Sequence, residues 1–164
     1  MNMRIVVMCL LFVLLLSTIA CFKKDSGCTI NNVIAPASEV TAVENYLSAK
    51  NITATKDPSG FYYEIVSLGS GTNPNECSGV NVGYVGKLTN DNVFDQSQSL
   101  SIGLSQVIEG WRKGLPLIQK GGEIKLYIPP TLGYGPIDVK DGQGNVVIPA
   151  NSILIFDVHL IDVQ

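Results

Sequence analysis

Five aromatic side chains are the clearest candidates for a binding site, and they come from five separate segments of the chain. They are Tyr84, Phe94, Trp111, Tyr134 and Phe156. Brought together, their rings would form a dry apolar surface, and the tyrosine hydroxyls would add hydrogen-bond donors. Such a surface could bind an apolar group. Composition alone, however, would assign any one of these residues to the core.

Other kinds of chemistry have little support. The single histidine, His159, alternates to the polar face of a terminal strand, so a Ser-His-Asp or Cys-His site is not indicated. One histidine and scattered carboxylates do not suggest a metal site. The polar run from Asp138 to Asn145 lacks the alternating ligands of a calcium loop, so we interpret it as turn chemistry within a long loop. A net charge of −3 offers no basic patch for nucleic acid.

The elements that must position the aromatic residues are short strands around one short helix. Alternating apolar residues predict strands at 61–66, 80–84, 124–128 and 154–160, and a return strand beginning at Val93. Helical spacing predicts a helix over 107–118, which Pro116 shortens or kinks. The predicted fold class is therefore α+β, with antiparallel strands around a short apolar helix and a single core.

An extra helix is predicted ahead of this domain. Apolar residues at positions 40, 43 and 47 follow helical spacing, and Ser38 suits the N-cap, so the helix is expected over Glu39–Lys50. Asn51 can end it in a left-handed conformation. We interpret this helix as a spacer that packs against the main domain but lies outside it.

The N-terminal segment predicts export. An apolar block follows Arg4 and is shorter than a membrane span, which is typical of a signal peptide. Ser17–Cys21 resembles the lipobox of bacterial lipoproteins, so the predicted parts are a signal peptide at 1–20, a lipidated tether with its helix at 21–58, and a domain at 59–164. Cys21 would carry the lipid and anchor the protein to a membrane. Phe22 is not the aspartate of an inner-membrane retention signal, which favours the outer membrane. An uncleaved anchor, or a simple signal peptide cut nearby, stays open.

Two cysteines remain outside the signal segment and the lipidation site. In an oxidising compartment Cys28 and Cys77 favour one disulfide, which would tie the N-terminal extension to the domain. Two free buried thiols are the alternative.

A series of short motifs resembles an FKBP-type prolyl isomerase over about residues 60 to 162. In the family's order they are Val82–Leu88, Val93–Asp95, Val107–Trp111, Gly114–Leu115, Gly121–Glu123, Ile128–Pro129, Gly133–Gly135 and Ile148–Val158. The resemblance implies an FKBP-like fold, in which the antiparallel sheet wraps around the short helix. It also implies peptidyl-prolyl cis–trans isomerase activity, with no cofactor or metal.

The resemblance also assigns roles to single residues. Trp111 forms the floor on which a proline ring sits, and the backbone N–H of Ile108 and the hydroxyl of Tyr134 bind substrate carbonyls. Asp95 sits beside Tyr84 near the twisted amide. The implied catalytic residues are Tyr84, Asp95, Tyr134 and Phe156. The implied substrate-binding residues are Phe94, Leu100, Val107, Ile108, Trp111, Val147 and Ile148, with Ile148 at the mouth of the pocket.

The same resemblance implies proline-containing polypeptides as partners and a macrolide as inhibitor. The protein is expected to be a monomer. Some positions depart from the family. Leu100 stands about where an aromatic residue is usual, Gln106 takes a position that is often acidic, and the loop over 135–147 is longer. Two alternatives to an isomerase stay open. One is a lipid-anchored chaperone or interaction module with the same pocket, and the other is a structural component of a surface complex.

Overall fold

The computed structural model describes residues 28–164. The predicted signal peptide at 1–20 and the predicted lipidation site at Cys21 lie outside the described residues. Within the part that the structure describes, no helix combines the length and the apolar character needed to cross a membrane.

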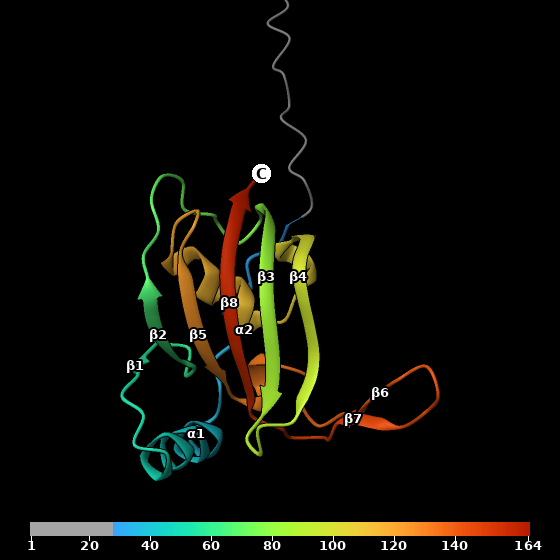
Figure 1. Ribbon diagram of the computed structural model, residues 1–164. Coiled ribbons are helices and arrows are strands. Elements are labelled where there is room, and N and C mark those ends of the chain that lie inside the picture. Colours follow the sequence, from blue (N-terminus) through green and yellow to red (C-terminus); the bar gives the residue numbers. More distant parts are fainter. Residues whose placement is uncertain (1–27) are drawn as a thin grey trace, which may run out of the picture.

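Six strands form one antiparallel sheet in the order β1-β2-β5-β8-β3-β4 (Figure 1). They are β1 (Thr55–Lys56), β2 (Tyr62–Ser67), β3 (Gly79–Leu88), β4 (Val93–Gly103), β5 (Glu123–Ile128) and β8 (Leu154–Val163). Because side chains alternate along a strand, β8 turns Leu154, Phe156, Val158 and Leu160 to one face, and all four are buried. This face forms the core.

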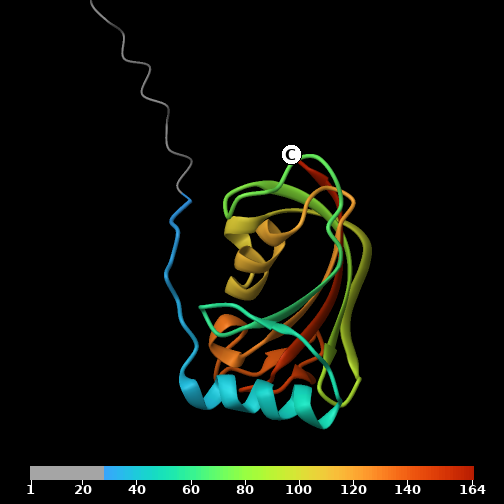
Figure 2. The same ribbon diagram turned by 90° about the vertical axis from the view of Figure 1, so that its left-hand side faces the viewer.

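The short helix α2 (Glu109–Gly114) covers the inner face of the curved sheet (Figure 2). Two glycines let it approach closely, since a Cβ at Gly110 would lie 2.5 Å from Ile128 and one at Gly114 would lie 2.6 Å from Leu126. The 3₁₀ turns η1 (Leu104–Gln106) and η2 (Leu115–Leu117) flank it. Pro116 lies in η2, so the prediction that it shortens the helix is confirmed. The α+β fold class, with the sheet wrapped around a short helix, is confirmed as well.

The predicted N-terminal helix is present as α1 (Ala37–Ala49), but its start was placed too late. Pro36 is the N-cap, with an extended backbone, and its carbonyl accepts hydrogen bonds from the N–H groups of Glu39 and Val40. Ser38 therefore falls inside the first turn and makes no capping bond. The left-handed conformation predicted for Asn51 is confirmed by its φ of 53°.

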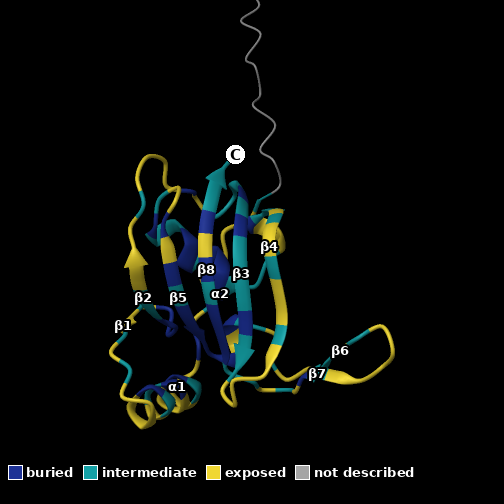
Figure 3. Cartoon of the chain, viewed as in Figure 1, coloured by how far each residue is buried: buried dark blue, intermediate teal, exposed yellow. Residues whose placement is uncertain are grey.

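Helix α1 is joined to the rest of the protein by packing and by hydrogen bonds. Val40, Val43 and Leu47 are buried and belong to the same core cluster as the sheet, as the dark face of α1 in Figure 3 shows. The carboxylate of Glu39 accepts hydrogen bonds from the backbone N–H and the hydroxyl of Thr131, each 2.8 Å long. Thr131 lies in the 3₁₀ turn η3 (Pro130–Leu132), so the helix does more than act as a spacer.

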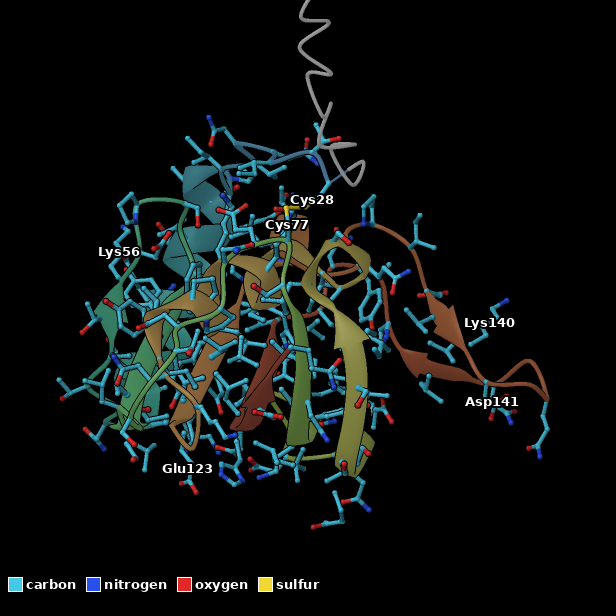
Figure 4. All side chains as sticks on the ribbon, turned by 90° about the horizontal axis from the view of Figure 1, so that it is seen from above. Cys28, Lys56, Cys77, Glu123, Lys140 and Asp141 are labelled. Atoms are coloured by element: carbon cyan, nitrogen blue, oxygen red, sulfur yellow. A yellow bond between two sulfur atoms is a disulfide. The ribbon has the colours of Figure 1, made fainter. Side chains whose placement is uncertain are left out.

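A disulfide joins Cys28 to Cys77 across 49 residues of chain (Figure 4). The buried guanidinium of Arg112 lies beside it and donates a hydrogen bond to the carbonyl of Thr29. Glu76 and Glu109 pair with this guanidinium at 3.5 and 3.3 Å. A buried charge needs such partners. The arrangement therefore fixes the N-terminal segment to α2.

The polar run after Gly135 is not a plain loop. It forms a two-stranded hairpin from β6 (Val139–Lys140) and β7 (Val146–Ile148). The predicted turn chemistry is confirmed, because Asp141 Oδ1 accepts hydrogen bonds from the N–H groups of Gln143 and Asn145, each 2.9 Å long. In Figure 4 Lys140 and Asp141 lie on an arm that stands away from the body.

Candidate functional site

A pocket of about 260 Å³ opens between α2, β3, β4 and β8. Its lining is Tyr84, Phe94, Asp95, Leu100, Ile102, Gln106, Val107, Ile108, Trp111, Tyr134 and Phe156. The five aromatic residues from separate segments therefore meet in one place. Trp111 is only 4% exposed, yet open space lies above it.

The rings support one another edge to face. Trp111 lies 5.0 Å from Tyr84 and 5.1 Å from Phe156 between centroids, with interplanar angles of 83° and 80°. Phe94 meets Phe156 at 5.5 Å and 88°. Aromatic pairs favour this geometry, so each ring restrains its neighbours. The apolar surface is therefore formed before any ligand arrives.

Gly86 makes room for this cluster. In the sheet it lies opposite Phe156 on β8 and Asp95 on β4. A Cβ at Gly86 would come within 2.7 Å of Phe94 and 2.8 Å of Phe156. The missing side chain on β3 is therefore the space that the two rings fill.

The polar groups at the edge of the pocket include two tyrosine hydroxyls and one carboxylate. The hydroxyl of Tyr84 donates a hydrogen bond of 2.7 Å to Asp95 Oδ2. Burial, followed by this bond, raises the pKa of Tyr84 above its ordinary value. Burial, followed by the charge of Asp95, also raises the pKa of Tyr134. Both hydroxyls therefore stay protonated at neutral pH, and the Tyr134 hydroxyl can donate to a bound acceptor.

The structure brings together every predicted catalytic and substrate-binding residue except Val147 and Ile148. Ile148 is 3% exposed and joins the core, because β7 pairs with β6 and turns this side chain inward. Val147 lines a neighbouring groove instead of the aromatic pocket. Neither residue lines the aromatic pocket, and their part in substrate binding stays a prediction.

Two lining residues were not predicted as site residues. Ile102 follows Leu100 on the inner side of β4, so the alternation of that strand could have identified it. Gln106 lies in η1, directly before the Val107–Trp111 motif. Its signal in the sequence was its departure from the family pattern, in which this position is often acidic.

The lining favours binding over covalent chemistry. Among the described residues, its lining has no serine, cysteine, lysine or histidine, and the one hydroxyl that is paired with a carboxylate, that of Tyr84, has a raised pKa and stays protonated. His159 is exposed on the outer face of β8. Such a pocket can bury an apolar ring and hold a neighbouring carbonyl with a hydroxyl donor.

Comparison with known proteins agrees with this geometry. A family model described as FKBP-type peptidyl-prolyl cis-trans isomerase matches residues 71–161. A Haemophilus influenzae protein named a probable FKBP-type peptidyl-prolyl cis-trans isomerase is 43% identical over 123 residues, which are 73% of this chain and 48% of that protein. FkpA from Escherichia coli is 40% identical over 125 residues, 74% of this chain and 43% of that protein. The chain thus spans about half the length of the curated relatives it matches.

Solved structures show the same fold. The crystal structure of FkpA from Escherichia coli matches with a TM-score of 0.66 at 37% identity, covering 78% of this chain and 60% of that one. A peptidyl-prolyl cis-trans isomerase from Pseudomonas syringae pv. tomato also matches with a TM-score of 0.66, at 28% identity, covering 79% of this chain and 97% of that one.

Proposed function

Because the chain belongs to the FKBP-type peptidyl-prolyl cis-trans isomerase family, we propose that it catalyses rotation about Xaa-Pro bonds in exported polypeptides. The observation that carries this proposal is the preformed aromatic pocket, in which Trp111 lies beneath open space between Tyr84 and Phe156.

The chemistry of the reaction suits such a pocket. Rotation about a peptide bond has a barrier of about 18–20 kcal/mol, because the planar amide is stabilised by resonance. In the twisted transition state that resonance is lost and the amide is less polar. A water-poor apolar site therefore disfavours the planar ground state relative to the transition state. No covalent intermediate is needed.

Each lining group then has a physical role. The proline ring rests on Trp111, between the rings of Tyr84, Phe94 and Phe156. Ile108 is the N-cap of α2, and the backbone N–H of an N-cap residue has no partner within its helix, so it is free to bind a substrate carbonyl. The Tyr134 hydroxyl binds a second carbonyl. Asp95 holds Tyr84 in place beside the rotating bond.

A peptide assay that compares the wild type with Tyr134→Phe tests this proposal. The purified protein should accelerate isomerisation of a short Xaa-Pro peptide. Tyr134→Phe should lower kcat/KM about 3- to 10-fold, the effect of one lost hydrogen bond. Tyr134 is 42% exposed, so the variant should fold. Peptide binding without any rate enhancement would instead favour the peptide-binding chaperone or interaction module.

We also propose that the protein is exported and lipid-anchored through Cys21, with the outer membrane as its location in a two-membrane bacterium. A signal-like block followed by small residues and a cysteine supports this. Metabolic labelling with a palmitate analogue should mark the wild type and not Cys21→Ser. Labelling of both proteins would overturn the assignment.

Macrolide binding and a monomeric state complete the proposal. The pocket that accepts a proline ring should accept the similar ring of a macrolide inhibitor, so the two ligands should compete. Competition of such a macrolide with the short peptide, and the mass of the protein in solution, test these points.

A further inference from the structure

A second groove borders the aromatic pocket. It has a volume of about 450 Å³ and is lined by Leu88, Asn90, Asn92, Val93, Phe94, Val146, Val147 and Pro149. Phe94 lines both hollows, so the groove begins where one wall of the aromatic pocket ends. Val147, which was predicted to bind substrate at the aromatic pocket, lines this second groove.

Two segments of the chain form the sides of this groove. One side is the connection between β3 and β4, and the other is β7 of the protruding hairpin (Figure 1). Val93 and Val146 face solvent on these two sides, with 51% and 47% of their surface exposed. Exposed apolar residues that gather around a hollow are typical of a binding surface.

A polypeptide substrate must extend beyond the aromatic pocket. An extended chain advances about 3.3 Å per residue, so residues that flank the proline lie on the surface next to the pocket. A chain that leaves past Phe94 enters the second groove directly. Because Phe94 lines both hollows, this continuity favours the same polypeptide as the occupant over a separate ligand.

We propose that this groove is a second subsite that binds an apolar side chain of the polypeptide whose proline occupies the aromatic pocket. The proposal rests on the proposed function and adds a substrate preference to it. Among the described residues, no charged side chain lines the groove. A charged flanking residue would lose hydration there without gaining a partner, whereas leucine or methionine would bury apolar surface.

A peptide series tests the preference. The peptides share one Xaa-Pro pair and carry a single leucine at each flanking position in turn, with serine and aspartate at the same positions for comparison. In the wild type, leucine at one position should raise kcat/KM about fivefold over serine, which corresponds to about 1 kcal/mol. Aspartate there should give no gain.

Two matched valine variants locate the effect. Val146→Ser should abolish the leucine preference and leave turnover of the serine peptide unchanged. Val66→Ser, an exposed valine on β2 that lines neither hollow, should keep the preference. Backbone amide signals of Val93 and Val146 should shift on adding the leucine peptide and much less on adding the serine peptide.

The outcomes separate this proposal from the proposed function. Turnover without any leucine preference, or a preference that survives Val146→Ser, would overturn the subsite while the isomerase assignment stands. Absence of turnover together with leucine-dependent shifts at Val93 and Val146 would support the subsite and refute the enzyme. Absence of both turnover and shifts would refute both.

Discussion

Gly86→Ala should disturb the aromatic pocket by adding a single carbon atom to β3. The new Cβ would lie 2.7 Å from Phe94 and 2.8 Å from Phe156, whereas ordinary contacts begin at 3.4 Å. The rings must therefore move apart by about 0.6–0.7 Å, or β3 must shift. Phe156 is 4% exposed and has little room, so Phe94, which is only partly buried, should move more.

The cost of this crowding can be estimated. Overpacking a well-filled site destabilises a protein by about 1–3 kcal/mol, and the mobility of Phe94 favours the lower part of that range. The effect on the reaction should be larger. Misplacing catalytic groups by about 1 Å lowers rates about 100-fold, so we expect kcat/KM to fall at least 10-fold.

Urea unfolding and the short-peptide assay measure the two effects. Gly103→Ala on β4 is a matched control, because its new Cβ would meet no atom closer than 3.6 Å. The control should retain activity and lose little stability. Full activity in Gly86→Ala would refute the claim that the two rings form the walls of the reactive pocket.

Three further predictions concern stability. Reducing the Cys28–Cys77 disulfide should cost about 4 kcal/mol in a urea titration, because the bridge closes a loop of 49 residues; a loss below about 1 kcal/mol would contradict this. Glu39→Ala removes the hydrogen bonds from α1 to η3 and should lower the free energy of unfolding by about 1 kcal/mol. Ser38→Ala should change it by no more than about 0.5 kcal/mol, because Ser38 does not cap the helix. Burial, followed by a hydrogen bond to a carboxylate, raises the pKa of Tyr127. The folded state then holds this proton more tightly than the unfolded state does. The contribution of Tyr127 to the free energy of unfolding should therefore be fully present below about pH 10 and fall above it. A free energy of unfolding that rises above this pH would exclude the contribution.

Much of the fold follows from local patterns in the sequence. The alternation in β5 and β8 and the helical spacing around Trp111 predict both type and position, because each has one face to bury. The start of α1 was misplaced because Ser38 is a good N-cap by type, while Pro36 holds the backbone in the required conformation two residues earlier. The role of Glu39 depends on Thr131, about 90 residues away, and no local pattern reports such a contact.

The sequence predicted the pocket residues that lie in family motifs. It did not predict the surface beside the loop over 135–147, which is longer here than is usual in the family. Trp111 and Phe156 lie in the most specific motifs, and both line the pocket. Val147 and Ile148 lie in β7 of the hairpin that the longer loop forms, and neither lines the aromatic pocket. The groove beside the pocket arises from that hairpin, so the sequence alone did not reveal it.

The most direct test of the central claim is exchange spectroscopy by NMR on an Xaa-Pro peptide at equilibrium, with a catalytic amount of the protein. The pocket predicts cis–trans exchange cross-peaks that require the protein, together with upfield shifts of the proline ring protons from the Trp111 indole. Ring shifts without faster exchange would contradict catalysis. Faster exchange with unshifted ring protons would contradict the assignment of the reaction to this pocket.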